Sequence, residues 1–135
     1  YPLTIPGEVD VRERRMMVVL RRGKEAPVNV KTGFMFYFDA DKIREPLMIR
    51  NRRNGDRYEP LGTKGSQKIK KLFIDRKIPR RERDRIALLA DRESVIWIEN
   101  LHASERVKVT PETKNILVLE IRPQTDGGGI PQENI

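Results

Sequence analysis

Short apolar runs recur along most of the chain, and charged or turn-forming residues separate them. Runs of this length that are rich in branched and aromatic residues predict β-strands. The strands expected are residues 16–20, 28–30, 34–38, 47–50, 86–90, 95–98, 106–109 and 116–121. The aromatic residues within 34–38 are interpreted as core rather than as a platform for stacking bases. Residues 39–42 interrupt this pattern and are expected to form one helical turn.

A polar loop interrupts the strand pattern in the middle of the chain. Asn54 and Gly55 tolerate positive φ angles and predict a turn. Pro60 and Gly62 prolong the loop, because neither favours a regular element. Ser66 follows as the expected N-cap of a helix.

Two helical segments follow this loop. Ile69, Leu72 and Phe73 are spaced i, i+3 and i+4, which gives one apolar helix face. Pro79 is expected at the first position of a second, shorter helix that ends at Arg85. The order of strands, helices and strands predicts an α+β, β-rich fold with two short basic helices inserted between strands.

The distribution of charge along the chain indicates what kind of partner it binds. Net charge is +8, and residues 42–92 contribute 17 − 7 = +10 while the remainder contributes 11 − 13 = −2. A phosphate backbone is the usual partner of such a segment, because each neutralised phosphate releases counterions. An anionic membrane surface also attracts positive charge. A solvated basic face without any partner is the simplest alternative.

Composition excludes several classes of chemistry. The chain has no cysteine, so disulfides, cysteine–zinc sites and thiol catalysis are absent. A reducing compartment is compatible with this composition, and the location expected for the chain is cytoplasmic. Its one histidine, His102, has no sequence partner for catalysis, and no HExxH, GxSxG, Walker A or GxGxxG pattern occurs. No catalytic residue, metal ligand or cofactor of this chain's own is therefore expected. No apolar run reaches the roughly 20 residues that span a bilayer. The chain opens on Tyr1, which is typical of a piece of a longer protein.

Basic side chains gather in three clusters around the loop and the two helices. Arginine forks onto phosphate through two N–H donors, and turn amides add a concave anion site. Without a recognisable base-reading motif, shape and backbone recognition of an RNA duplex is expected. The residues expected to contact RNA are Arg53, Arg57, Lys64, Lys68, Lys70, Lys71, Lys77, Arg80, Arg81, Arg83 and Arg85.

A second set of residues is expected to shape the site rather than touch RNA, and consists of Gly55, Asp56, Pro60, Gly62 and Pro79. Asp56 lies among Arg53, Arg57 and the Gly55 turn, and it is expected to accept backbone N–H bonds and to orient an arginine. Its loss should destabilise the fold by about 1–2 kcal/mol.

A family resemblance is carried by three segments, RNGDRYEPLG at 53–62, KIKKLFID at 68–75 and KIPRRERD at 77–84. In order and spacing they resemble the C-terminal domain of bacterial tRNA(Ile)-lysidine synthetases. RNGDRYEPLG at residues 53–62 is similar to the R-x-GDR-aromatic-x-PLG pattern of that family. KIKKLFID at 68–75 and KIPRRERD at 77–84 resemble its next helix and the segment after it. The strand with Trp97 also fits. The resemblance implies a domain over residues 46–121 and a preceding or packing β-segment over 1–45. The tail over 122–135, rich in glycine with Gly127-Gly128-Gly129, is expected to be disordered because it can bury little.

The resemblance also implies a function. The family attaches lysine to the wobble cytidine of a tRNA(Ile) with a CAU anticodon, with ATP and magnesium as cofactors of the whole enzyme. Its C-terminal domain is implied to hold the acceptor stem, and its fold resembles a β-sandwich module of the phenylalanyl-tRNA synthetase β chain. The implied partners are this tRNA and the catalytic N-terminal domain of the same chain, with no membrane; a homodimer stays open. The SGGxDS nucleotide motif is absent from these residues, so the chain alone is expected to be inactive.

Two alternatives remain at this point. One is an unrelated RNA- or ribosome-binding β module, and the other is a protein-interaction domain whose basic patch meets an acidic partner. An RNA binder would show a steep salt dependence, relieved by tRNA but not by single-stranded polymer.

Overall fold

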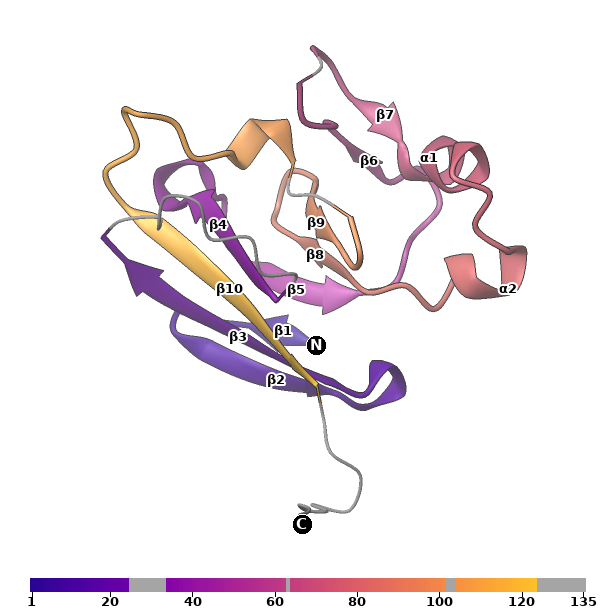
Figure 1. The fold of residues 1–135 in the computed structure, drawn as a ribbon, viewed down its shortest axis with the longest axis horizontal. Helices are drawn as coiled ribbons and strands as arrows, with labels where there is room; N and C mark the ends of the chain where they lie inside the picture. The colour runs from indigo at the N-terminus through magenta and orange to yellow at the C-terminus, as the bar shows by residue number, and fades with distance from the viewer. Residues whose placement is uncertain (25–33, 63, 102–103, 124–135) are drawn as a thin grey trace.

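A computed structural model describes residues 1–24, 34–62, 64–101 and 104–123 (Figure 1). Within these residues, the strands form two antiparallel four-stranded sheets and one small hairpin. The central sheet has the order β1-β5-β8-β9, and the outer sheet has the order β2-β3-β10-β4. The strand bounds are β1 Pro2–Leu3, β2 Gly7–Val11, β3 Met16–Gly23, β4 Met35–Asp39, β5 Leu47–Arg50, β8 Leu88–Ala90, β9 Val95–Ile98 and β10 Ile116–Pro123.

The hairpin and the helices complete the described fold. β6 (Arg57–Tyr58) pairs with β7 (Gln67–Lys68), and α1 (Ile69–Asp75) follows at once. The second helix, α2, spans Arg80–Arg83. Three short 3-10 turns are η1 Arg12–Arg14, η2 Ala40–Lys42 and η3 Glu105–Val107. The expected α+β, β-rich fold with two short helices between strands is confirmed.

The central sheet lies between two layers and is buried on both faces. One face shares a core with the outer sheet, where Leu89 and Trp97 pack with Leu20 and Leu117. The opposite face shares a second core with α1 and the hairpin. Figure 1 shows β6, β7, α1 and α2 on one side of β8 and β9, and the outer sheet on the other. Burial on both faces explains why β8 and β9 are continuous apolar runs rather than alternating ones.

The second core is built from the helical periodicity of α1. Ile69, Leu72 and Phe73 are buried at 0%, 7% and 0% exposure, respectively, and pack with Leu88 and Ile98. Burial of such side chains contributes roughly 1.5–3 kcal/mol each. The remaining positions of a seven-residue helix must face solvent, which is where its lysines lie.

The aromatic run in β4 belongs to the core, as expected. Phe38 is fully buried, and the ring of Phe36 meets that of Trp97 edge-on at 5.6 Å between centroids. Phe34 lies outside the strand and is exposed.

The described residues of 1–45 contribute strands to both four-stranded sheets. β1 pairs with β5, and β10 lies between β3 and β4 in the outer sheet. β10 also continues through Arg122 and Pro123, which pair with Met17 and Met16, so two residues assigned to the tail belong to a strand. The rest of that tail lies outside the described residues.

Several local expectations were wrong. Residues 106–109 do not form a strand, because Ser104 caps the turn η3 through a hydrogen bond from the Arg106 N–H. Ser66 is not the N-cap of α1: Lys68 holds that position, and the Ser66 hydroxyl accepts a bond from Arg57 instead. Pro79 is the N-cap of α2 rather than its first helical residue, and α2 ends at Arg83. The predicted strand 28–30 and His102 lie outside the described residues.

Candidate nucleic-acid interface

Most of the basic residues singled out from the sequence lie on one side of the molecule. They belong to the loop after β5, the hairpin, α1, α2 and the segments that join these elements, all beyond the central sheet from the outer sheet (Figure 1). Nine of them are exposed and form no ion pair with any described residue. This set, called the basic surface below, is Arg53, Lys64, Lys68, Lys70, Lys71, Lys77, Arg80, Arg81 and Arg85.

Nearby carboxylates do not neutralise the basic surface. Asp84 pairs with Arg52 at 3.3 Å, and Arg52 is not a member of the surface. Within the described part of the chain, Asp75 and Glu82 form no ion pair. The positive charge therefore stays available to an anion outside the domain. This observation argues against a face whose basic side chains only pair with neighbouring carboxylates.

Two other predicted RNA contacts are used inside the fold. Arg57 donates from Nε to the Ser66 hydroxyl at 2.8 Å and from its second amino group to the Ser66 carbonyl at 3.1 Å, which ties the hairpin together. Arg83 donates from Nε to the Ile78 carbonyl at 2.8 Å and fixes the bend between α1 and α2. Each arginine keeps further N–H donors.

Asp56 holds the loop that carries Arg53. Both carboxylate oxygens accept from the Arg50 guanidinium, at 2.7 and 3.0 Å, and Oδ2 also accepts the Arg53 backbone N–H at 2.6 Å. Burial raises the pKa of Asp56, but the Arg50 and Arg53 hydrogen bonds outweigh burial and hold this pKa below its ordinary value of 3.8. Asp56 thus accepts a backbone N–H and orients an arginine, and that arginine is Arg50.

Arg50 could not be recognised as this partner from the sequence, since its position at the end of an apolar strand gave no sign of pairing six residues later. Arg76 was also missed. It is exposed beside α1 and adds positive charge to the same side of the molecule.

Glu105 anchors the hairpin loop to the rest of the fold. Its side chain accepts the Gly62 N–H at 2.8 Å, and its backbone N–H donates to the Glu59 carbonyl at 2.7 Å. Gly62 has a φ of +78°, which favours glycine at this point. Lys108, followed by the Gly62 N–H, holds the pKa of Glu105 below its usual range.

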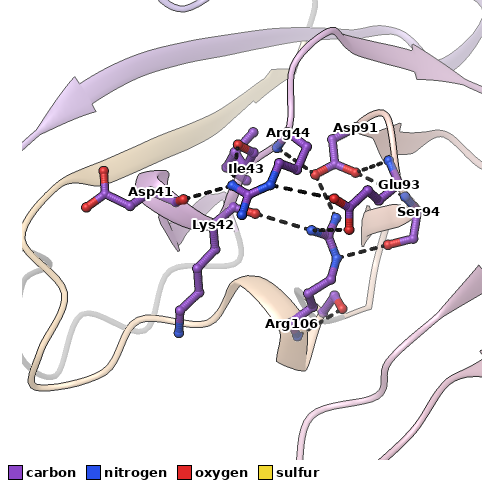
Figure 2. Close-up of polar contacts among 9 residues, drawn as sticks. Asp41, Lys42, Ile43, Arg44, Asp91, Glu93, Ser94 and Arg106 are labelled. Carbon is purple, nitrogen blue, oxygen red and sulfur yellow. Dashed lines mark hydrogen bonds and ion pairs between the residues drawn. The ribbon is translucent and has the colours of Figure 1, made fainter.

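A buried ion pair in turn fixes the position of Glu105. Figure 2 shows Arg106 pointing from η3 toward Asp91, with 2.6 Å between Nη2 and Oδ2. Arg106 also donates to the Ser94 hydroxyl and the Lys42 carbonyl. Asp91, whose side chain is 0% exposed, accepts three backbone N–H groups besides. Burial raises the pKa of Asp91, yet the Arg106 bond and these N–H groups keep it below its ordinary value.

Metal binding and membrane crossing are the other two properties that bear on the function of the described residues. No group of three or more metal-binding side chains occurs among them. None of the helices within the described ranges is long and apolar enough to cross a membrane.

Comparison with known families agrees with this geometry. The family model described as the TilS substrate C-terminal domain matches residues 47–121. The chain belongs to this family. The match covers β5 through most of β10 and includes every residue of the basic surface.

Individual relatives point the same way. The chain is 42% identical over 90 residues to a tRNA(Ile)-lysidine synthase of Caldanaerobacter subterraneus subsp. tengcongensis, covering 67% of this chain and 19% of the relative. It is 45% identical over 96 residues to that of Clostridium tetani, covering 71% and 21%. It is 29% identical over 131 residues to that of Symbiobacterium thermophilum, covering 96% and 27%. The chain thus spans about a fifth to a quarter of the length of these relatives.

Solved structures support the fold. A crystal structure of a TilS C-terminal domain superposes with a TM-score of 0.76 at 27% identity, covering 92% of this chain and 95% of the other. An N-terminal fragment of the phenylalanyl-tRNA synthetase β-subunit from Pyrococcus horikoshii gives a TM-score of 0.51 at 24% identity, covering 68% and 28%. The second likeness concerns the fold alone.

Proposed function

We propose that this chain is the tRNA-binding C-terminal part of a tRNA(Ile)-lysidine synthase and that its basic surface holds the backbone of the acceptor stem. The observation that carries the proposal is the set of nine exposed cations that form no ion pair with any described residue, in a chain of this family. Unpaired cations on one side of a domain attract a phosphate backbone, whose binding releases counterions. The surface lies on a loop, a short hairpin and two short helices fixed to a buried sheet, which suits shape recognition of a duplex.

In the whole enzyme, this surface supplies grip rather than chemistry. The proposed parent reaction joins lysine to the wobble cytidine of tRNA(Ile) with a CAU anticodon, at the expense of ATP, in a domain outside this chain. A distant grip contributes equally to the bound ground state and transition state, so it lowers KM for tRNA more than it raises kcat. A cytoplasmic location follows from the same proposal.

Charge reversal on the basic surface tests the proposal. Lys68→Glu with Lys71→Glu should weaken binding of the acceptor-stem duplex strongly while the melting temperature stays unchanged, because both side chains are exposed. Arg21→Glu with Arg22→Glu is the matched control, since it makes the same change in net charge on exposed positions of β3 in the outer sheet. The control should bind nearly as the parent does. In the full-length enzyme, the first pair should raise KM for tRNA.

The salt dependence gives a second measurement. If about four to six phosphates are contacted, affinity should fall by about two decades or more over a few-fold rise in salt. Duplex RNA should compete and single-stranded polymer should not. A flat salt titration, or equal losses in both double variants, refutes the proposed surface. Competition by an acidic protein but not by RNA would favour a protein-interaction domain instead.

A further inference from the structure

A concave pocket lies where the Asn54-Gly55 turn faces the start of α1. Its volume is about 210 Å³. It is lined by Arg52, Asn54, Gly55, Asp56, Lys68 and Lys70. One water molecule occupies about 30 Å³ of liquid, so the pocket has room for one phosphate group and several waters.

The charge inside this pocket is positive. The Asp56 carboxylate is already engaged by the Arg50 fork and the Arg53 N–H, so it does not neutralise the lysines. Lys68 and Lys70 are exposed and have no ion pair among the described residues.

Arg52 adds a third cation at the pocket wall. Its partner Asp84 has a side chain that is 72% exposed, and a pair at such an exposed carboxylate is weak. The Nε of Arg52 is buried and has no hydrogen-bond partner in the described part of the chain. The guanidinium is therefore only partly satisfied by the protein itself.

The turn supplies uncharged donors. The backbone N–H groups of Asn54 and Gly55 have no hydrogen-bond partner among the described residues. Gly55 has a φ of +90°, and a Cβ at this position would meet no atom within 4 Å, so the turn is open to a ligand. Successive turn amides with such angles form anion-binding concavities.

We infer that this pocket is the binding site of a single phosphate of the RNA backbone, gripped by Lys68, Lys70 and Arg52 together with the amides of the turn; this inference rests on the RNA-binding function proposed above. The rest of the basic surface meets other phosphates through exposed side chains, whereas the pocket fixes the register of the duplex at one phosphate. Lys71 neighbours Lys70 on α1 but does not line the pocket.

This neighbour makes a matched control. Lys70→Gln and Lys71→Gln each remove one positive charge from an exposed side chain of the same helix. Lys70→Gln should weaken binding of an acceptor-stem duplex about tenfold, as expected for loss of a charge-assisted hydrogen bond. Lys71→Gln should weaken it only about twofold, as expected for a general charge effect. Both variants should melt as the parent chain does.

Removing the charge of one RNA phosphate at a time identifies which phosphate binds in the pocket. Single methylphosphonate substitutions along the duplex remove one phosphate charge at a time. At one position the substitution should cost about as much as Lys70→Gln, and the two changes together should cost no more than either alone. In the Lys71→Gln variant, the loss of affinity caused by the same methylphosphonate should multiply with the loss caused by the variant itself.

The outcomes separate the two proposals. Equal losses of affinity for Lys70→Gln and Lys71→Gln would refute the phosphate site. So would a Lys70→Gln variant whose loss of affinity multiplies with that of the methylphosphonate at every position. In both cases the parent chain still binds RNA, so the proposed function stands. A parent chain that binds no duplex RNA at low salt overturns the proposed function itself.

Discussion

Replacing Asp56 with alanine removes the side chain that ties the loop after β5 into one conformation. Three hydrogen bonds to the carboxylate are lost, two from Arg50 and one from the Arg53 N–H. Hydrogen bonds to charged groups contribute about 1.5–3 kcal/mol each when they are buried. Here the Arg50 and Asp56 side chains are 16% and 13% exposed, so water replaces part of what is lost. We expect a total destabilisation of about 2–3 kcal/mol, which exceeds the sequence expectation because the pair is bidentate.

Thermal unfolding measures this loss. At about 4 °C for each kcal/mol in a domain of this size, the melting temperature should fall by about 8–12 °C. Asp75→Ala, which removes an exposed carboxylate without an ion pair among the described residues, should shift stability by less than about 0.5 kcal/mol.

The pH dependence of the same variant gives an independent check. The folded pKa of Asp56 lies below 3.8, so the unfolded chain takes up the proton first as pH falls. The Asp56 contribution is therefore complete above about pH 5 and is lost as pH falls through the folded pKa. Asp56→Asn should remove this part of the acid sensitivity. An unchanged melting temperature in Asp56→Ala together with lost RNA binding would refute the structural role and make Asp56 a direct contact.

Three further predictions concern the Asp91–Arg106 ion pair, the second core and the lysine-joining activity. Asp91→Asn removes the buried carboxylate that pairs with Arg106 and leaves only the half-exposed Glu93 at 3.8 Å, so it should cost about 3 kcal/mol in urea unfolding; a loss under about 1 kcal/mol contradicts the buried-pair geometry. Phe73→Ala opens a cavity in the second core and should cost about 3–5 kcal/mol by the same measurement, whereas a change near zero would mean that α1 does not pack as described. Incubated with ATP, labelled lysine and the cognate tRNA, this chain alone should incorporate no lysine, because it has no SGGxDS motif; any incorporation contradicts this.

The regular strands were predictable because their apolar residues are local patterns. β3, β4, β5, β9 and β10 coincide with apolar runs, and α1 carries the expected i, i+3, i+4 face. The hairpin β6–β7 was missed, since strands of two residues have no periodicity to detect. The turn η3 was mistaken for a strand because alternation over four residues does not reveal a capping serine.

Of the candidate site, the sequence predicted only which segment carries the positive charge. The sequence located the positive segment and the family motif, yet it could not say which arginines are free. Arg57 and Arg83 are engaged inside the fold, whereas Arg53 forms no ion pair with any residue that the structure describes. Hydrogen-bond partners are chosen by geometry among several chemically equal candidates, and sequence distance does not rank them.

The sequence by itself determined the strand and helix pattern, the basic segment and the membership of a family, because periodicity, charge and motif are properties of neighbouring residues. Only the tertiary structure decided how distant segments meet. The pair Arg14–Glu99 joins residues 85 positions apart, and β10 is placed between two strands from the other end of the chain. The pocket proposed to bind a phosphate is of the same kind, since packing α1 on the central sheet brings Lys70 to the Asn54-Gly55 turn. Such contacts depend on burying two apolar faces at once, and no local pattern specifies that arrangement.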